Sequence, residues 1–448
     1  MRKLAEKTRR TGRRTAPQSP KPTVHRRFDD GYAAGYQDGL QTGMAAYGTV
    51  YEGTSIVIPT YNQADYLRKC IDSIIDYTDL PYEIIVVDNG STDGTAGYLA
   101  SLKGRVRYRL LETNLGFAAA VNRGLMMAKG QTIALLNNDA LVTEHWLENM
   151  LRCLHSDERI GMVGPVTNYI GGEQLVQTNY SSIPEMYAFA RKHNTPDPVK
   201  WRETNRLTGF CLLFRRELWE RTGYWDEGFA NGNFEDDDYS VRIRMQGCSL
   251  MIAGDAFVHH YGSVTIKSFG KDYETINSRN EQYYIDKWRD PHGLVHRARA
   301  VGGSALYGQT DFYPRFTAVK GLGDTVFWLD GGERRPIDGD SGGLPVVQLT
   351  QIDIGRFPIG PAISAAEAEA AWRTDRVAAG MRGGVLTASP EGALYYVESG
   401  LRRFVASAEA AEAWKLSAKP MVQATHEQLS GLPEGLPVIA PGRCGQRL

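Results

Sequence analysis

Four consecutive carboxylates have the clearest potential for chemistry in this chain: Glu235, Asp236, Asp237 and Asp238. Like charges this close raise one another's pKa, so the run requires a cation, a helix N-terminus or a proton-transfer role. A structural alternative is that Asp238 caps a helix over residues 239–246, which Gly247 ends in a left-handed conformation. Because capping explains one or two acids and not four, we expect the run to carry chemistry.

Short apolar runs alternate with helical stretches between Ser55 and Leu136. We expect strands at residues 55–59, 83–87, 106–111 and 132–136, and helices at 64–76, 95–102 and 118–128. Apolar strands separated by helices of about ten residues are typical of a mainly parallel, doubly wound α/β sheet. Ligands of such sheets bind at the carboxyl ends of the strands. The loops that follow these strands are therefore expected to line one crevice.

Those loops carry polar residues suited to a nucleotide. Asp88 ends the second strand, where its carboxylate can accept hydrogen bonds from an imide nitrogen or from ribose hydroxyls. Gly116 lets the backbone approach a diphosphate, and the helix that starts near Ala118 offers free N–H groups. Ordinary turn chemistry explains each residue equally well, so their order along the chain matters more than any one of them.

Asp139 is a candidate metal ligand. It follows the apolar strand 133–136 and two asparagines, so it faces the same crevice. One carboxylate beside a nucleotide diphosphate suits Mg²⁺ or Mn²⁺, because phosphate oxygens and water complete the shell. The pair His259-His260 can supply a late ligand to this metal. The alternatives are an Asx turn at Asp139 and structural histidines.

The order of these motifs resembles that of the family-2 inverting glycosyltransferases with the GT-A fold. The resemblance covers residues 54–288 and rests on an ordered set of motifs: Pro59-Thr60-Tyr61-Asn62, Asp88, Asn137-Asn138-Asp139, Glu235-Asp236-Asp237-Asp238 and His259. It implies a Rossmann-like mixed sheet, a UDP- or dTDP-sugar as donor and a glycan or protein as acceptor. It is compatible with a rhamnosyltransferase-like member.

The resemblance also implies a role for each matched residue. Asp236 corresponds to the general base, with Glu235 and Asp238 supporting it, while Asp139 and His259 correspond to ligands of Mn²⁺ or Mg²⁺. Asn137 stands where the strict motif has its first acid. The implied donor-binding residues are Pro59, Tyr61, Asn62, Asp88, Asn114, Gly116, Phe117, Asn122 and Asn138. Configuration inverts because the acceptor oxygen attacks the anomeric carbon from the face opposite the diphosphate, as Asp236 takes its proton.

Two other functions compete with this interpretation. A sugar nucleotidyltransferase requires a Gly-rich loop with Arg or Lys near the first strand, and residues 59–62 lack one. A catalytically inactive carbohydrate-binding or scaffold protein would use the C-terminal region. The retention of Asp88, Asp139, Asp236 and His259 argues against this alternative.

The C-terminal region contains an internal repeat. Residues 326–335 match 394–403, and residues 347–360 match 422–435. We expect a basic and Gly/Tyr-rich segment at 1–50, a glycosyltransferase domain at 51–298 and an accessory α+β module at 299–448, with repeats at about 320–365 and 388–440. The paired arginines and aromatic residues of each repeat suit carbohydrate binding, and a role in the core is the alternative.

Composition sets the remaining expectations. With 42% hydrophobic and 23% charged residues, the 448-residue chain is typical of a globular protein. Residues 1–27 contain ten basic residues and one acid. We expect this segment to be a solvated tail or to contact an anionic membrane surface. Gly31, Gly35, Gly39 and Gly43 permit self-association as a homo-oligomer. Five scattered cysteines and no apolar run long enough for a membrane span predict a cytoplasmic protein with reduced thiols, and we expect no nucleic-acid partner.

Overall fold

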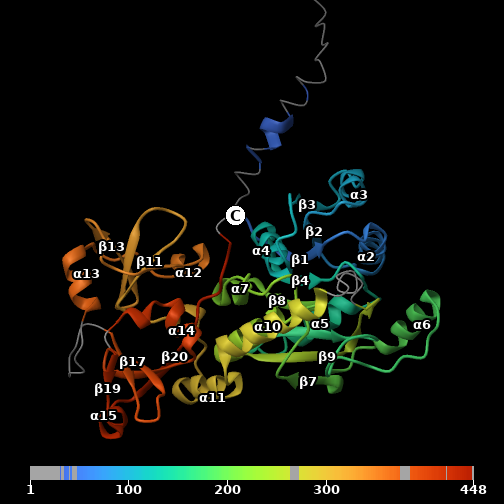
Figure 1. Cartoon of the computed structure of the whole chain (residues 1–448). Coiled ribbons are helices and arrows are strands. Elements are labelled where there is room, and N and C mark those ends of the chain that lie inside the picture. The colour runs from blue at the N-terminus through green and yellow to red at the C-terminus, as the bar shows by residue number, and fades with distance from the viewer. Residues whose placement is uncertain are drawn as a thin grey trace, which may run out of the picture. The chain divides into compact units, whose positions relative to one another are not determined.

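An eight-stranded mixed sheet forms the centre of residues 51–260 (Figure 1), in the strand order β3-β2-β1-β4-β8-β6-β9-β7. The parallel half consists of β1 (Tyr51–Thr60), β2 (Tyr82–Asp88), β3 (Arg107–Leu110) and β4 (Gly130–Leu136). The mixed half consists of β8 (Cys211–Arg215), antiparallel to both neighbours, β6 (Ile160–Val166), β9 (Ser249–Phe257) and the edge strand β7 (Trp201–Thr204). The predicted α/β class with a mixed sheet is confirmed.

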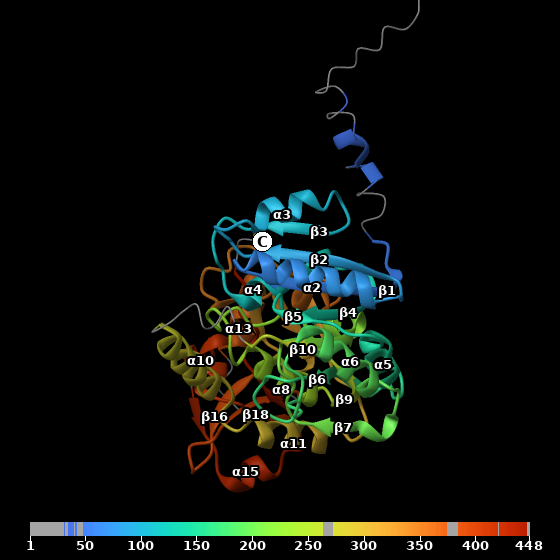
Figure 2. The same cartoon turned by 90° about the vertical axis from the view of Figure 1, so that its right-hand side faces the viewer.

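Helices cover both faces of this sheet because its central strands are apolar on both sides. Ile56 and Ile58 of β1 pack on one face, and Val57 packs on the other. The first face is covered by α2 (Ala64–Tyr77), α3 (Thr95–Ser101) and α5 (Trp146–Leu154), of which Figure 2 shows α2 and α3 beside β1 to β3. The second face is covered by α4 (Phe117–Met127), α7 (Arg216–Thr222) and α8 (Glu235–Met245), and α6 (Ile183–His193) contributes two residues to the same cluster.

A two-stranded sheet lies beside the carboxyl end of β4. It pairs β5 (Ala140–Leu141) with β10 (His259–His260) in antiparallel register, so that His260 is opposite Ala140. The Tyr261 N–H also donates to the carbonyl of Asp139 at 3.0 Å. This pairing brings the two histidines next to Asp139, 120 residues earlier in the chain.

The C-terminal region folds as two copies of one unit, drawn in orange and red in Figure 1. Each copy is a five-stranded sheet, in the orders β14-β11-β12-β13-β15 and β19-β16-β17-β18-β20. The first contains β11 (Thr317–Lys320), β12 (Val326–Asp330), β13 (Glu333–Asp338), β14 (Val346–Gln348), α12 (Gln351–Gly355), β15 (Ile363–Ser364) and α13 (Ala365–Trp372). The second contains β16 (Val385–Ala388), β17 (Leu394–Glu398), β18 (Leu401–Val405), α14 (Ala408–Ala413), β19 (Met421–Gln423), α15 (His426–Ser430) and β20 (Glu434–Val438).

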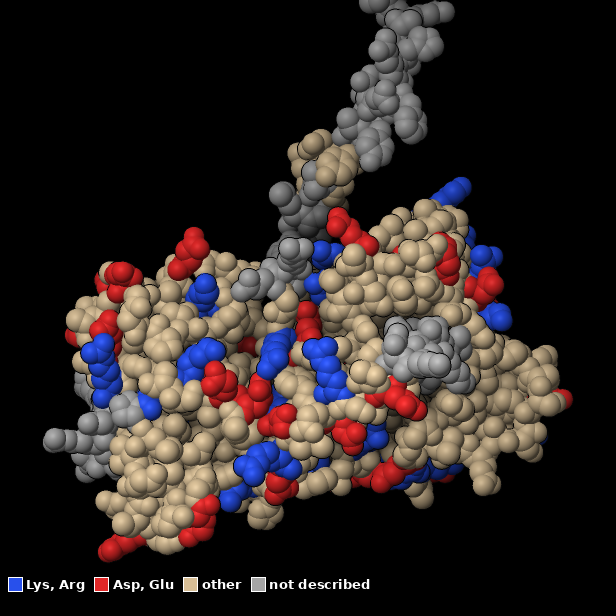
Figure 3. Space-filling view, viewed as in Figure 1, with Lys and Arg blue, Asp and Glu red and all other residues tan. Residues whose placement is uncertain are grey.

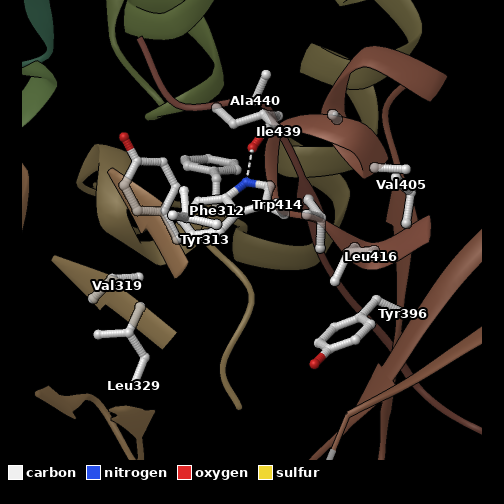
Figure 4. Packing of buried hydrophobic residues seen from close by; sticks show 14 of the residues in the cluster. Phe312, Tyr313, Val319, Leu329, Tyr396, Val405, Trp414, Leu416, Ile439 and Ala440 are labelled. Carbon is white, nitrogen blue, oxygen red and sulfur yellow. Dashed lines mark hydrogen bonds between the residues drawn. The ribbon is translucent and has the colours of Figure 1, made fainter. Parts of the chain in front are cut away.

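The two repeats share their core with helices of the preceding domain. This cluster contains Val241 of α8 and Trp288 of α10 (Asp272–Trp288), together with residues of α11 (Pro291–Gly302) and of both repeats. Figure 4 shows its centre, where the Trp414 indole N–H donates to the carbonyl of Ile439 at 2.7 Å. The predicted domain boundary at residue 298 falls inside α11, and the boundaries remain a prediction.

The structure, a computed structural model, describes residues 48–262, 272–373, 384–419 and 421–445, together with 31, 35–39 and 41–42. The basic tail and Gly43 lie outside this set. Residues 1–49 form a unit separate from residues 50–448. No helix in the described ranges is both long and apolar enough to cross a membrane. On the face in Figure 3, basic side chains are interspersed with acidic ones.

Candidate active site

A cavity of about 500 Å³ opens at the carboxyl ends of β1 and β4 and at the start of β8. These three ends meet because β8 runs antiparallel to β4, with Cys211 opposite Leu136. Eight predicted site residues line the cavity: Pro59, Tyr61, Asn114, Phe117, Asn138, Asp139, Glu235 and Asp236. The cavity is also lined by Thr60, Asn89, Asn137, Tyr169, Ile170, Gly171, Arg206, Thr208, Gly209, Phe210, Asn231, Gly232, Asn233, His260 and Tyr273.

The first two strand-end loops are bonded to each other. The Asn62 side-chain oxygen accepts the N–H of Thr92 at 2.9 Å, and the Asn62 N–H donates to the Ser91 hydroxyl at 2.7 Å. The buried Asp88 accepts the Ser91 N–H at 3.0 Å. Asn62 and Asp88 are therefore not part of the cavity lining, and they hold the loop over residues 89–92 beside it.

Asn89 joins the second loop to the third. Its amide N–H donates to the side-chain oxygen of Asn114 at 2.8 Å and to the carbonyl of Gly116 at 3.1 Å, and its oxygen accepts the N–H of Leu115. Gly116 has a φ of +92° just before α4 begins at Phe117, which is a conformation that favours glycine. Asn89 is not among the predicted site residues, because an asparagine after a strand is also an ordinary turn residue.

Asn122 does not line the cavity. Its side chain is fully buried, where it donates to the carbonyl of Trp225 and to Glu227 and accepts the N–H of Trp225 at 2.9 Å. These bonds anchor the segment 225–227 to α4. Because Asn122 bonds to this segment and is not part of the cavity lining, its contacts favour a supporting role, and the donor-binding role stays a prediction.

His260, and not the predicted His259, faces Asp139. The His260 Nε2 lies 3.2 Å from Asp139 Oδ1, and both side chains are buried and line the cavity. His259 points to the opposite side, where its Nδ1 is 2.7 Å from the Tyr180 hydroxyl. Burial lowers the pKa of His259 to about 4, so its ring is neutral. Successive residues of a strand point to opposite faces, which is why only one of the pair reaches Asp139.

The pair Asp139 and His260 fits a divalent metal. The His260 Nδ1 lies 2.9 Å from the carbonyl of Tyr169, to which only a protonated nitrogen can donate. In the neutral ring this leaves a lone pair on Nε2, directed at the Asp139 carboxylate. A backbone carbonyl that fixes the tautomer is a usual partner of a metal-binding histidine. Among the described residues no group of three or more His, Cys, Asp or Glu suited to a metal occurs. Divalent metals of this kind commonly take water and phosphate oxygens as further ligands.

The acidic run forms the first turn of α8. The helix begins at Glu235 after Phe234, whose φ is +72°, so Asp238 lies within the first turn and does not cap the helix, contrary to the structural alternative. Gly247 has the predicted left-handed conformation, with a φ of +87°. Four acids in a first turn interact favourably with the helix dipole.

The four carboxylates have different surroundings. Asp236 lines the cavity and accepts the N–H groups of Gly209 and Asp237, each at 2.9 Å. Burial, and then the charge of Asp236, raise the pKa of Glu235 well above its ordinary value. The same two causes raise the pKa of Asp237 to about 7, although Arg206 lies 2.5 Å from it.

Asp238 lies in the core, away from the cavity. Its carboxylate is fully buried and bonds to Lys287 at 2.6 Å, to Arg242 at 2.9 Å and to the Trp288 indole at 2.9 Å. Lys287 also lies 2.5 Å from Asp226. Asp238 therefore connects the start of α8 to α10. Any support that it gives to Asp236 acts through the position of α8.

Comparison with known proteins shows which family this chain belongs to. Residues 55–223 match the family described as Glycosyl transferase family 2. An uncharacterized glycosyltransferase of Rickettsia typhi is 33% identical over 232 residues, which cover 51% of this chain and 67% of that protein. The chain belongs to glycosyltransferase family 2. The predicted family and its GT-A fold class are thus confirmed, and the nucleotidyltransferase alternative is not supported.

Two further matches of this glycosyltransferase have lower sequence identity. Chondroitin synthase of Escherichia coli is 25% identical over 240 residues, covering 47% of this chain and 35% of that protein. The chain thus spans about a third of the length of that relative. The crystal structure of GalNAc-T7 with UDP, GalNAc and Mn²⁺ is 17% identical, with a TM-score of 0.40, and covers 56% of this chain and 48% of the other.

Proposed function

We propose that this family-2 glycosyltransferase moves a hexose or deoxyhexose from a UDP- or dTDP-sugar to a hydroxyl of a glycan or protein, with inversion. One observation carries the proposal: the Asp236 carboxylate and the pair Asp139 and His260 line a single cavity of about 500 Å³. A general base and a candidate metal pair thus face the same space. Cavities of this size hold small molecules.

The roles follow from position. Asp236 accepts the proton of the acceptor hydroxyl as that oxygen bonds to the anomeric carbon, while the bond from this carbon to the diphosphate breaks and the nucleoside diphosphate departs. The Gly209 and Asp237 N–H groups hold the Asp236 carboxylate in the orientation that faces the cavity. Bound Mn²⁺ or Mg²⁺ would stabilise negative charge on the departing diphosphate.

The proposed metal ligands are Asp139 and His260. The proposed donor side consists of the loops at Pro59, Asp88, Asn114 and Gly116, which the bonds of Asn62 and Asn89 hold together. Arg206 is a further candidate, since the residue lines the cavity and its guanidinium, paired with Asp237, carries the charge that a diphosphate or an anionic sugar requires.

A substrate panel tests this proposal. The full chain is mixed with UDP-, dTDP- and GDP-sugars, Mn²⁺ or Mg²⁺, and a set of methyl glycosides as acceptors. We expect one donor to release its nucleoside diphosphate and to give a product of inverted anomeric configuration by NMR. Failure to bind or turn over any donor, together with glycan binding, would support the inactive binding protein instead.

A further inference from the structure

The loop that leads into the acidic run follows an unusual backbone path. Four consecutive residues have positive φ: Asn231 at +58°, Gly232 at +121°, Asn233 at +77° and Phe234 at +72°. Such conformations are unfavourable for residues other than glycine and persist only where the surroundings enforce them. We name residues 230–234 the pocket loop, since Asn231, Gly232 and Asn233 line the cavity.

The pocket loop lies between the Gly116 loop of the proposed donor side and the proposed base, Asp236. It packs closely on the Gly116 loop, as shown by the fact that a Cβ added at Gly116 would lie 3.2 Å from the backbone nitrogen of Asn231. On the other side it continues directly into Glu235 and Asp236. Its path therefore fixes how far Asp236 lies from the Gly116 backbone, where the diphosphate is expected.

A single side chain on another helix holds this path. Asn280 of α10 is fully buried, and its Oδ1 accepts the N–H of Ala230 at 3.0 Å. Its Nδ2 donates to the carbonyls of Ala230 at 2.9 Å, Gly232 at 2.7 Å and Asn233 at 3.2 Å. The amide thus supplies both the acceptor and the donors that this backbone lacks within its own segment.

Two neighbours on the same helix face extend the contact. Asn233 donates through Nδ2 to Asn277 at 3.2 Å and to the Tyr273 hydroxyl at 3.4 Å. Residues at positions i, i+4 and i+7 of a helix share one face, as Tyr273, Asn277 and Asn280 do. Tyr273 also lines the cavity, so this polar face of α10 reaches the site.

We propose that Asn280 is a positioning residue for glycosyl transfer, which holds the pocket loop in the left-handed path that leads into Glu235 and Asp236. The inference rests on the proposed function. Asn280 does not line the cavity and acts only through the loop backbone. Its effect should therefore fall on transfer to the acceptor and leave nucleotide binding intact.

The test compares Asn280→Asp and Asn280→Ala with Gln282→Ala. Asn280→Asp keeps the shape and the acceptor but loses the donors, and Gln282 is an exposed amide on the same helix, bonded to Asp286. For each variant we measure hydrogen exchange over residues 229–235, the thermal transition and the Kd for UDP with Mn²⁺. We also measure kcat and KM for the donor and the methyl glycoside that the panel identifies.

We expect loop exchange to rise roughly tenfold in both Asn280 variants because the loop opens more readily. Transfer should fall about 100-fold, the usual effect of a small misplacement of reacting groups, while the Kd for UDP stays within about twofold. Gln282→Ala should match wild type in every readout.

Three outcomes would overturn the proposal: unchanged loop exchange, wild-type transfer by Asn280→Asp, or loss of the thermal transition in both Asn280 variants. The last would make Asn280 a stabilising residue only. If wild type neither binds UDP nor transfers sugar, the proposed function fails separately, and the exchange data still decide whether Asn280 holds the loop.

Discussion

At the scale of single residues, the fold accommodates the acidic run because each of its carboxylates has different surroundings. Asp236 faces the cavity, Asp237 pairs with Arg206, and Asp238 is neutralised in the core by Lys287 and Arg242. Glu235 is buried with a raised pKa and has no hydrogen-bond partner for Oε2 in the described part of the chain. Of the four carboxylates, Glu235 and Asp236 line the cavity, and Asp236 is the one that backbone N–H groups orient.

The raised pKa of Asp237 predicts a dependence of stability on pH. Burial, and then Asp236, raise this pKa from 3.8 to about 7 in the folded protein. Between about pH 4 and pH 7 the unfolded chain loses this proton more readily than the folded chain, so the free energy of unfolding falls as pH rises. Asp237→Asn removes this contribution, and its free energy of unfolding should fall less over that interval.

Chemical denaturation at a series of pH values from 4 to 8 measures this slope. Glu281→Gln, which changes an exposed acid of α10, is the control and should keep the wild-type slope. Equal slopes for Asp237→Asn and wild type would show that Asp237 ionises normally in the folded protein.

At the scale of elements, the paired arginines of the two repeats hold the fold of each unit. Arg334 donates through Nη1 to the carbonyl of Ile354 at 2.8 Å, and Arg402 donates in the same way to Leu429 at 2.8 Å. The next arginine of each pair, Arg335 or Arg403, also bonds to backbone carbonyls. These contacts favour the structural alternative over carbohydrate binding for the arginines.

The equivalence of Arg334 and Arg402 predicts matched mutational effects. Arg334→Met and Arg402→Met each remove a charged donor from a helix-end carbonyl, which should lower the free energy of unfolding by about 1–3 kcal/mol. Arg299→Met, at an exposed arginine of α11, should change it by less than about 0.5 kcal/mol. Urea denaturation measures all three, and a neutral result at either repeat position would contradict the shared role.

At the scale of the whole molecule, residues 51–298 and the repeats depend on one core. Trp288, Leu294 and Val295 are buried in a cluster that includes both repeats. The chain also returns from the second repeat to the segment before the pocket loop, where the Glu227 N–H donates to the carbonyl of Arg443 at 2.8 Å. The Arg443 N–H in turn donates to the buried Asp226 at 3.1 Å.

This shared core predicts that the fragment 51–298 does not fold alone. Without the repeats its buried tryptophan and leucine would be exposed, and large exposed apolar patches promote aggregation. We expect the fragment to bind a hydrophobic dye and to lack a cooperative thermal transition, whereas 51–448 melts cooperatively. A cooperative transition of the fragment within a few degrees of the longer chain would support the predicted boundary at residue 298.

The sequence predicted the parallel half of the sheet closely, because apolar strands and amphipathic helices carry local signals. It could not separate His259 from His260, since the choice depends on the register of β10 against β5. It could not show that Asn122 bonds to Trp225 or that Asp238 bonds to Lys287, since these contacts depend on packing with distant segments. Asn280 carried no local signal, because its partners lie about 50 residues earlier in the chain.

The most direct test of the account compares donor binding and turnover in Asp236→Asn and Asp139→Ala, with Glu281→Gln as control. We predict that both site variants lose turnover by about 100-fold or more, while only Asp139→Ala loses Mn²⁺-dependent donor binding. Asp236→Asn should bind the donor as wild type does. If Asp236→Asn keeps wild-type turnover while the donor binds normally, Asp236 is not the base and the central claim fails.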